Sequence, residues 1–89
     1  MPQTVLSIVN RRGLHARASA KFVKQAEEFD AVIEVSKDGA TVLGTSIMGL
    51  MMLSASKGDQ INVKAEGIQS EAALSALEKL VSAGFHEEN

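Results

Sequence analysis

The clearest hydrophobic pattern in the chain is a strict alternation over residues 60–66. Ile61, Val63 and Ala65 fall on one side, and polar residues occupy the positions between them. A period of two predicts a β-strand with one buried and one solvated face, which is typical of an antiparallel sheet. Shorter runs of the same kind, rich in β-branched residues, predict three further strands at residues 4–9, 32–36 and 41–43.

Two longer segments have the period of an amphipathic α-helix. Residues 16–28 are rich in Ala, Lys, Gln and Glu, and their apolar side chains form one stripe at helical spacing. Residues 70–83 carry a second stripe of the same period. The predicted buried positions are Phe22, Val23, Ala26 and Phe29 in the first helix, and Ala73, Leu74, Leu77, Leu80 and Val81 in the second.

Turn and cap residues mark the ends of these elements. Asp38-Gly39 lies between two strand-like runs and predicts a tight hairpin, because both central positions of such a turn favour positive φ. Ser70 is expected to cap the second long helix, and Gly84 is expected to end it. Residues 86–89 are predicted to form a polar frayed tail.

A short segment after Ser46 is apolar all round. As a two-turn helix capped by Ser46, it would place Leu50 and Leu53 on one side and Ile47, Met48 and Met51 on the other. A thin two-layer domain cannot easily bury both sides, so we expect one side to be exposed as a docking surface. Methionine suits such a surface, since it is flexible and polarizable. A fully buried segment or a core strand is the alternative, and an apolar run this short does not decide between them.

The predicted order of elements is strand, helix, strand, strand, short helix, strand, helix. The 89 residues contain no linker or internal repeat and are expected to form one domain over residues 1–89. Four half-buried strands need cover on one face, which the helices supply. The sequence therefore predicts an α+β fold, an open-faced two-layer sandwich with split-βαβ topology.

The composition of the chain excludes several classes of function. The chain has no cysteine, which excludes disulfides and thiolate metal sites and fits a reducing compartment. No run reaches the length of a membrane span, and the N-terminus lacks a basic-then-apolar signal, so we expect a cytoplasmic protein that does not insert into the membrane. A net charge of −2 with three Phe, no Tyr and no Trp argues against nucleic acid as a partner. There is no Gly-rich nucleotide loop, and we expect neither a cofactor nor a metal.

The most informative motif is Gly-Leu-His-Ala-Arg at residues 13–17, immediately before the first predicted helix. His15 there would face the unpaired N–H groups of the helix start, where an anion is favoured. An imidazole can act as a nucleophile near neutral pH, and Arg17 adds a positive fork suited to phosphate oxygens. The motif therefore fits a seat for a phosphoryl group carried on His15. The alternative is a surface-loop histidine beside an unrelated arginine.

Ser46 also has two interpretations. As an N-cap it contributes about 0.5–2 kcal/mol to helix stability. As a phosphorylation site it would place a charge of about −1.5 to −2 beside the docking surface and weaken the binding of acidic or apolar partners. The residues alone favour the cap.

Taken together, the chain resembles the histidine-containing phosphocarrier family, HPr, of the bacterial phosphotransferase system. The resemblance covers nearly the whole chain in one register. It is carried by Gly13-Leu14-His15-Ala16-Arg17, Ser46-Ile47-Met48-Gly49 and Lys57-Gly58, together with Phe22, Phe29 and Gly39.

The resemblance implies a βαββαβα fold whose antiparallel sheet has the order 1-4-2-3. It implies that His15 accepts a phosphoryl group on Nδ1 from enzyme I, which takes it from phosphoenolpyruvate, and passes it to a histidine of an EIIA protein or domain. The chain would be a carrier and not itself an enzyme. We expect it to act as a monomer.

Further roles are implied for residues around His15. Arg17, with the backbone N–H groups of Ala16 and Arg17, would hold the phosphoryl group. Ser46 matches a regulatory serine that HPr kinase/phosphorylase modifies. The implied partner-binding residues are Ala20, Lys24, Ile47, Met48, Gly49 and Met51.

One departure from the family and two alternative functions have to be considered. Ala18 stands where the family usually has proline, and we expect the site to survive with a less rigid helix start. Residues 50–53 and 82–85 also resemble NPr, the nitrogen-related paralogue, so a nitrogen-regulatory carrier is an alternative. The rival is a split-βαβ module that binds without covalent chemistry, which should carry aromatic or basic side chains on its exposed sheet face.

Overall fold

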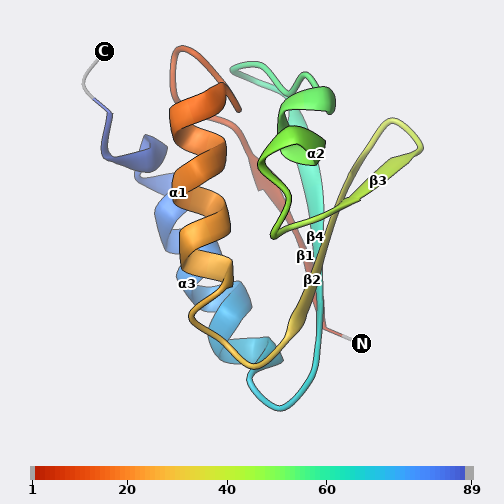
Figure 1. Ribbon diagram of the computed structural model, residues 1–89. Coiled ribbons are helices and arrows are strands. Elements are labelled where there is room, and N and C mark those ends of the chain that lie inside the picture. The colour runs from red at the N-terminus through yellow and green to blue at the C-terminus, as the bar shows by residue number, and fades with distance from the viewer. Residues whose placement is uncertain (1, 88–89) are drawn as a thin grey trace.

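All three α-helices lie on one side of a four-stranded sheet in the computed structural model, which describes residues 2–87 (Figure 1). The chain alternates strands and helices in the expected βαββαβα order. The elements are β1 (Gln3–Ser7), α1 (Ala16–Ala26), β2 (Val32–Lys37), β3 (Ala40–Leu43), α2 (Ile47–Met52), β4 (Gln60–Glu66), α3 (Ser70–Ser82) and a final 3-10 turn, η1 (Gly84–His86).

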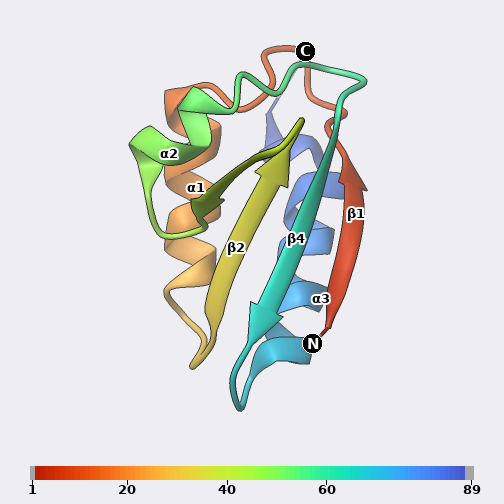
Figure 2. The ribbon, with the colours of Figure 1, turned by 90° about the vertical axis from the view of Figure 1, so that its right-hand side faces the viewer.

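The sheet has the order β1-β4-β2-β3, and every neighbouring pair is antiparallel. Because β1 and β2 are both antiparallel to β4, they run in the same direction, and α1 connects them across the back of the sheet (Figure 2). This is the split-βαβ topology, and the predicted order 1-4-2-3 is confirmed. It brings the N-terminal strand beside the last strand before α3.

The core lies between the sheet and the helices. Ile61, Val63 and Ala65 of β4 are at most 1% exposed, as their alternation predicts. Phe22 of α1 and Leu77 of α3 are fully buried against that face. Each such side chain contributes about 1.5–3 kcal/mol when it leaves water, so this single layer stabilises the whole domain. The remaining buried positions predicted from the helical stripes are confirmed except for Phe29 and Leu74, which are only partly buried.

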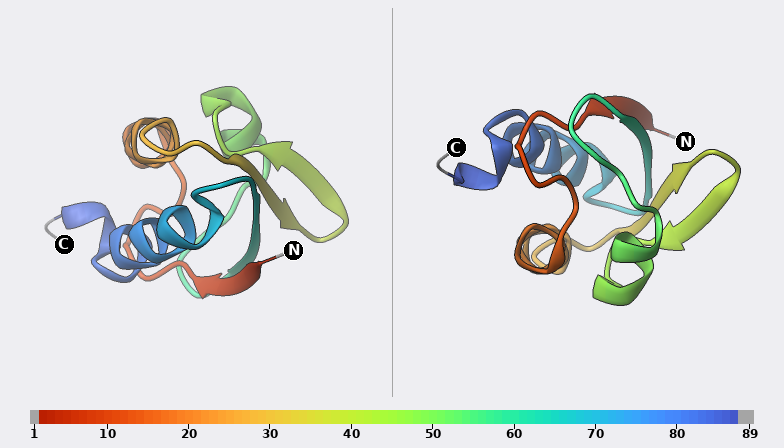
Figure 3. Two further views of the ribbon diagram at one scale, coloured as in Figure 1. Left: turned by 90° about the horizontal axis from the view of Figure 1, so that it is seen from below. Right: turned by 90° about the horizontal axis from the view of Figure 1, so that it is seen from above.

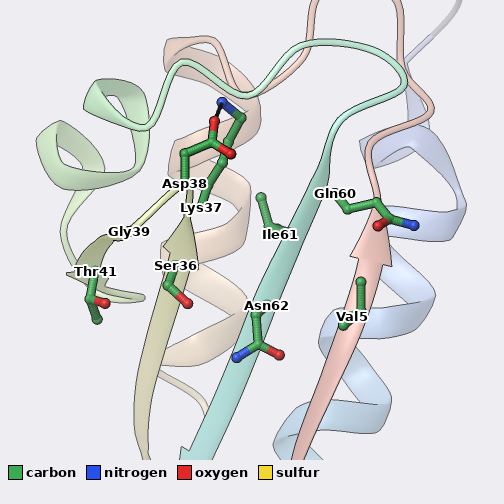
Figure 4. Close-up of a pocket in the computed structure, with 9 residues that line it drawn as sticks. All are labelled: Val5, Ser36, Lys37, Asp38, Gly39, Thr41, Gln60, Ile61 and Asn62. Carbon is green, nitrogen blue, oxygen red and sulfur yellow. Dashed lines mark hydrogen bonds and ion pairs between the residues drawn. The ribbon is translucent and has the colours of Figure 1, made fainter.

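The opposite face of the sheet is open (Figure 2), and the β4 residues on it, at alternate positions from Gln60 to Glu66, are all polar. At the end of the sheet that carries the β2–β3 turn it has a shallow hollow of about 370 Å³, lined by side chains such as Ser36, Thr41 and Asn62 (Figure 4). There Lys37 donates to Asp38 at 2.9 Å, which raises the pKa of Lys37. Among residues 2–87 no aromatic side chain lies on this face, because all three Phe pack on the helix side. The open face therefore lacks the stacking groups that the binding-module rival requires.

The β2–β3 hairpin has the predicted two-residue turn. Lys37 pairs with Ala40, and the two residues between them, Asp38 and Gly39, have φ values of 51° and 85°. Positive φ at both positions matches the right-handed twist of the flanking strands.

The prediction that Ser70 caps α3 is wrong. Ser70 is the first helical residue, and Gln69 occupies the cap position without a side-chain cap hydrogen bond. The Gln69 side chain instead accepts a hydrogen bond from the Asp30 N–H at 2.7 Å. This contact joins the start of α3 to the loop between α1 and β2. The other end is as expected, since α3 ends at Ser82 and Gly84 adopts a φ of 63°.

The prediction of a frayed tail is wrong for residues 86 and 87, while residues 88 and 89 lie outside the described range. The chain turns back in η1, with the Phe85 side chain fully buried. The Lys21 ammonium group donates to the Phe85 carbonyl at 2.6 Å. Phe85 anchors the segment in the core, which holds Glu87 close to the start of α1.

We predict that Phe85→Ala lowers the free energy of unfolding by about 3–5 kcal/mol, because it empties a fully buried aromatic site. Urea denaturation at neutral pH measures this loss. Ile68→Ala is the control, because Ile68 is 90% exposed and its truncation removes little buried surface. Equal stability of the two variants would show that the end of the chain is not anchored.

Candidate functional site

The loop that leads into α1 is held by a close backbone contact. Gly13 has a φ of 65°, and a Cβ at that position would lie 2.3 Å from the carbonyl oxygen of Ala55. The next residue, Leu14, is buried and donates its N–H to the same carbonyl at 2.9 Å. Only glycine, which has no Cβ, allows the backbone to come this close to the Ala55 carbonyl. Gly13 therefore fixes the position of the loop from which His15 caps the helix.

His15 is the N-cap of α1. Its backbone is extended, with φ −74° and ψ −179°, and its Nδ1 accepts the N–H of Arg17 at 3.3 Å. The imidazole thus takes the place of the usual Ser, Thr or Asp oxygen at a helix start. The side chain is 16% exposed, so the ring is neither free in solvent nor sealed in the core. The predicted position of His15 immediately before the helix is confirmed.

The other ring nitrogen of His15 contacts a residue that the sequence did not reveal. Nε2 is hydrogen-bonded to one carboxylate oxygen of Glu87, and Asn10 donates its amide to the other carboxylate oxygen at 2.9 Å. Burial raises the pKa of Glu87, but hydrogen bonds from Asn10 and His15 and the charges of His15 and Lys21 outweigh that effect. The pKa of Glu87 therefore lies below its ordinary value, and the carboxylate is ionised at neutral pH.

The side chains predicted around His15 on α1 point outward. Ala16, Arg17, Ala20 and Lys24 are all exposed. Arg17, Ala20 and Lys24 are spaced three and four residues apart, which places them on one face of the helix. Ala18 is fully buried within a helix that begins regularly at Ala16. Alanine at position 18 thus leaves the helix start intact.

The helix start itself can hold an anion. The first four N–H groups of an α-helix have no partner within the helix, and they carry the positive end of its dipole. Here the N–H of Arg17 is directed at Nδ1 of His15. A group bonded to Nδ1 would therefore sit against these donors with the exposed Arg17 side chain nearby.

The short helix α2 lies at the same end of the molecule and contacts α1 (Figures 1 and 3). Ser46 caps it, accepting the N–H of Gly49 at 3.0 Å. Gly49 is confined at this contact, because a Cβ there would lie 3.0 Å from both the Ser46 hydroxyl and the Val42 side chain. The predicted helix and its cap are confirmed.

The two sides of α2 differ sharply in exposure. Leu50 and Leu53 are buried, whereas Met48 is 70% exposed. The alternatives of a fully buried segment and of a core strand are therefore excluded. The apolar surface that remains in solvent, which we call the α2 patch, consists of Ile47, Met48, Met51 and Met52.

Other chemistries find little support in the described structure. Between residues 2 and 87, no cluster of His, Asp or Glu side chains is arranged to bind a metal ion. The same part of the chain contains no helix with the length and hydropathy needed to span a bilayer. Lys57 and Gly58, the third element of the resemblance, lie exposed in the loop before β4.

Comparisons with known proteins match this arrangement. The family described as "PTS HPr component phosphorylation site" matches residues 2–83. Phosphocarrier protein HPr of Neisseria meningitidis is 44% identical over 82 residues, which cover 92% of each chain. The crystal structure of HPr-C-His from Thermoanaerobacter tengcongensis superposes with a TM-score of 0.95 at 42% identity over the whole of both chains. An HPr dimer from the same organism has a TM-score of 0.78 at 41% identity, covering 98% of this chain and 100% of the other.

We predict that the contact of Glu87 with His15 and Asn10 makes stability depend on pH. Because the folded-state pKa of Glu87 is lowered, its stabilising contribution is present at neutral pH and is lost as the pH falls below 4.5, the ordinary pKa of this group. Urea unfolding of the wild type and of Glu87→Gln, from about pH 6 to about pH 3, measures the contribution.

The wild type should be the more stable protein at the upper end of this range, and the difference should shrink toward the lower end. Glu78→Gln, at an exposed glutamate of α3, controls for the removal of a carboxylate. A difference between wild type and Glu87→Gln that stays constant with pH would contradict the prediction.

Proposed function

The chain belongs to the HPr family of phosphocarrier proteins of the bacterial phosphotransferase system, and on that premise we propose that His15 accepts a phosphoryl group from enzyme I and passes it to an EIIA protein or domain. The observation that carries the proposal is the position of the His15 imidazole. Its Nδ1 lies at the start of α1 with its lone pair toward a backbone N–H.

The transfer needs little covalent chemistry from the carrier itself. Nδ1 gives up its hydrogen bond from the Arg17 N–H and attacks phosphorus in line with that lone pair, while the bond between phosphorus and the donor breaks and the donor keeps the electron pair. The backbone N–H groups of Ala16 and Arg17 and the Arg17 guanidinium stabilise the phosphoryl oxygens. The partner protein completes the site, so the chain is a carrier rather than an enzyme.

The α2 patch supplies the docking surface in this proposal. Its exposed methionines offer an adaptable apolar contact, and α2 stands next to α1, so a partner on the patch would reach the start of α1. The exposed face of α1 adds polar contacts at its edge. Partner contact is proposed for Ala20, Lys24, Ile47, Met48, Gly49 and Met51.

Ser46 is proposed as a regulatory site for HPr kinase/phosphorylase. Its side chain is partly exposed, and it lies next to Ile47 of the α2 patch. A phosphate there would lie at the N-terminus of α2, where the helix dipole tolerates its negative charge. It would weaken docking, because it would repel an acidic partner and would have to lose its water against an apolar one.

The proposed site is built from one copy of the chain, and we propose that the carrier acts as a monomer in the cytoplasm with its phosphotransferase partners. The two hydrogen bonds of the His15 ring, from the Arg17 N–H to Nδ1 and between Nε2 and Glu87, form within one chain. The experiment that follows uses the unmodified protein with enzyme I.

We predict that the chain gains one phosphate when it is mixed with enzyme I and phosphoenolpyruvate, and that His15→Ala gains none. Intact mass measured at neutral to basic pH reports the addition. His86→Ala is the matched control and should be phosphorylated like the wild type, because the His86 side chain is exposed and the hydrogen bonds to the His15 ring come from Arg17 and Glu87. Phosphate retained in His15→Ala would overturn the proposal.

Adding each candidate EIIA protein to the phosphorylated carrier identifies the acceptor. The mass of the added phosphate should disappear from the carrier and appear on the EIIA that it serves. Discharge by a nitrogen-type EIIA alone would assign the chain to the nitrogen-regulatory branch, and discharge by a sugar-type EIIA would assign it to sugar uptake.

We predict that Ser46→Asp slows phosphorylation by enzyme I by about tenfold, which corresponds to about 1.4 kcal/mol of lost docking energy. Ser46→Asn is the control, because asparagine also caps a helix but carries no charge. Initial rates at low carrier concentration separate the two variants. If Ser46→Asp and Ser46→Asn are phosphorylated at the same rate, charge at this position does not regulate docking.

A further inference from the structure

We propose that Glu87 is a positioning residue for His15, holding its imidazole in the tautomer that leaves Nδ1 free to accept a phosphoryl group. This inference rests on the proposed role of His15. It assigns a function to Glu87, which lies in the stretch of residues 86–89 that the sequence predicted to be a frayed tail.

The argument begins with the two ring nitrogens, whose contacts select the same tautomer. The Arg17 N–H can only donate, so the Nδ1 that it faces at 3.3 Å must offer a lone pair. The Glu87 carboxylate can only accept when it is ionised, so the Nε2 that it contacts must carry the proton. Both contacts therefore favour the neutral ring with hydrogen on Nε2. A ring with hydrogen on Nδ1 would lose both hydrogen bonds.

Asn10 holds the carboxylate oxygen that does not contact the ring. Its amide is 1% exposed and donates to the Gly13 carbonyl at 2.8 Å and to Glu87 at 2.9 Å. Because both of its N–H groups have acceptors, the amide has only one sensible orientation. Asn10 thus links Glu87 to the loop that carries His15.

The backbone conformation of residues 84–86 places Glu87 next to His15. Gly84, Phe85 and His86 all have positive φ, at 63°, 57° and 59°. Two consecutive non-glycine residues in this region are unfavourable by themselves and need support from the surroundings. The buried Phe85 ring and the hydrogen bond from Lys21 to the Phe85 carbonyl provide that support. The segment is therefore a built part of the site.

The carboxylate also bears on the transfer step. When Nδ1 bonds to phosphorus and the donor departs with its electron pair, the ring keeps its Nε2 hydrogen and gains a positive charge. That charge develops next to Glu87, which stabilises it as a carboxylate behind an imidazole does in a hydrolase triad. Glu87 is placed across the ring from Nδ1, so it does not occupy the space of the incoming phosphoryl group.

The test compares the wild type with Glu87→Gln and Glu87→Ala. Long-range ¹H–¹⁵N correlation spectra identify the protonated nitrogen of His15 at a pH where the ring is neutral, with His15→Ala to assign the signals. We expect the Nε2–H form in the wild type and a mixture of tautomers in Glu87→Ala. The signals of the other imidazole, His86, are recognised because they persist in His15→Ala.

The same proteins are then phosphorylated by enzyme I and phosphoenolpyruvate. Glu87→Gln and Glu87→Ala should react about tenfold more slowly than the wild type, which is the lower end of the loss found when the partner that orients a metal-bound imidazole is removed. Glu78→Gln should react at the wild-type rate. Unchanged spectra and rates in folded Glu87 variants would overturn the inference and leave the role of His15 intact. Failure of the wild type to gain phosphate would instead overturn the proposed function.

Discussion

The site depends on one hydrogen bond, from the Arg17 N–H to Nδ1 of His15 at the first turn of α1. An imidazole in the cap position satisfies a donor of the helix start with a nitrogen that is also a nucleophile. The same donors that stabilise the helix can stabilise an anion bonded to that nitrogen. The requirement that His15 sit at this point explains the glycine before it, since the chain must pass within contact distance of the Ala55 carbonyl to enter the helix there.

The fold gathers three chain segments at one end of the molecule. The loop into α1, the helix α2 and the turn η1 all lie there, in the upper part of Figure 1. The open sheet face has no part in this arrangement, although it carries the hollow of Figure 4. The antiparallel order β1-β4-β2-β3 brings these segments together, because the chain returns to the same end of the sheet after each pair of elements. The fold thereby places the His15 ring and the α2 patch at the same end of the molecule.

Sequence patterns correctly predicted those elements whose structure is determined by neighbouring residues. The alternation around Ile61 and Val63 identified a central strand, and Asp38-Gly39 identified a hairpin, because backbone preference and burial agree at those positions. Two predictions failed where a distant contact prevails over local preference. At α3 the Gln69–Asp30 hydrogen bond replaces a serine cap. At the end of the chain, Glu87 meets a histidine 72 positions earlier, which no spacing rule could show. The buried Phe85 after a glycine stop was the available signal that the tail returns to the core.

The most direct measurement is to locate the phosphorus on the ring. A carrier labelled with ¹⁵N-histidine is phosphorylated by enzyme I and phosphoenolpyruvate, and ³¹P–¹⁵N couplings are recorded before the phosphate hydrolyses. Our account predicts a coupling from phosphorus to Nδ1 of His15, with hydrogen retained on Nε2. A coupling to Nε2 of His15, or to either nitrogen of His86, would contradict it.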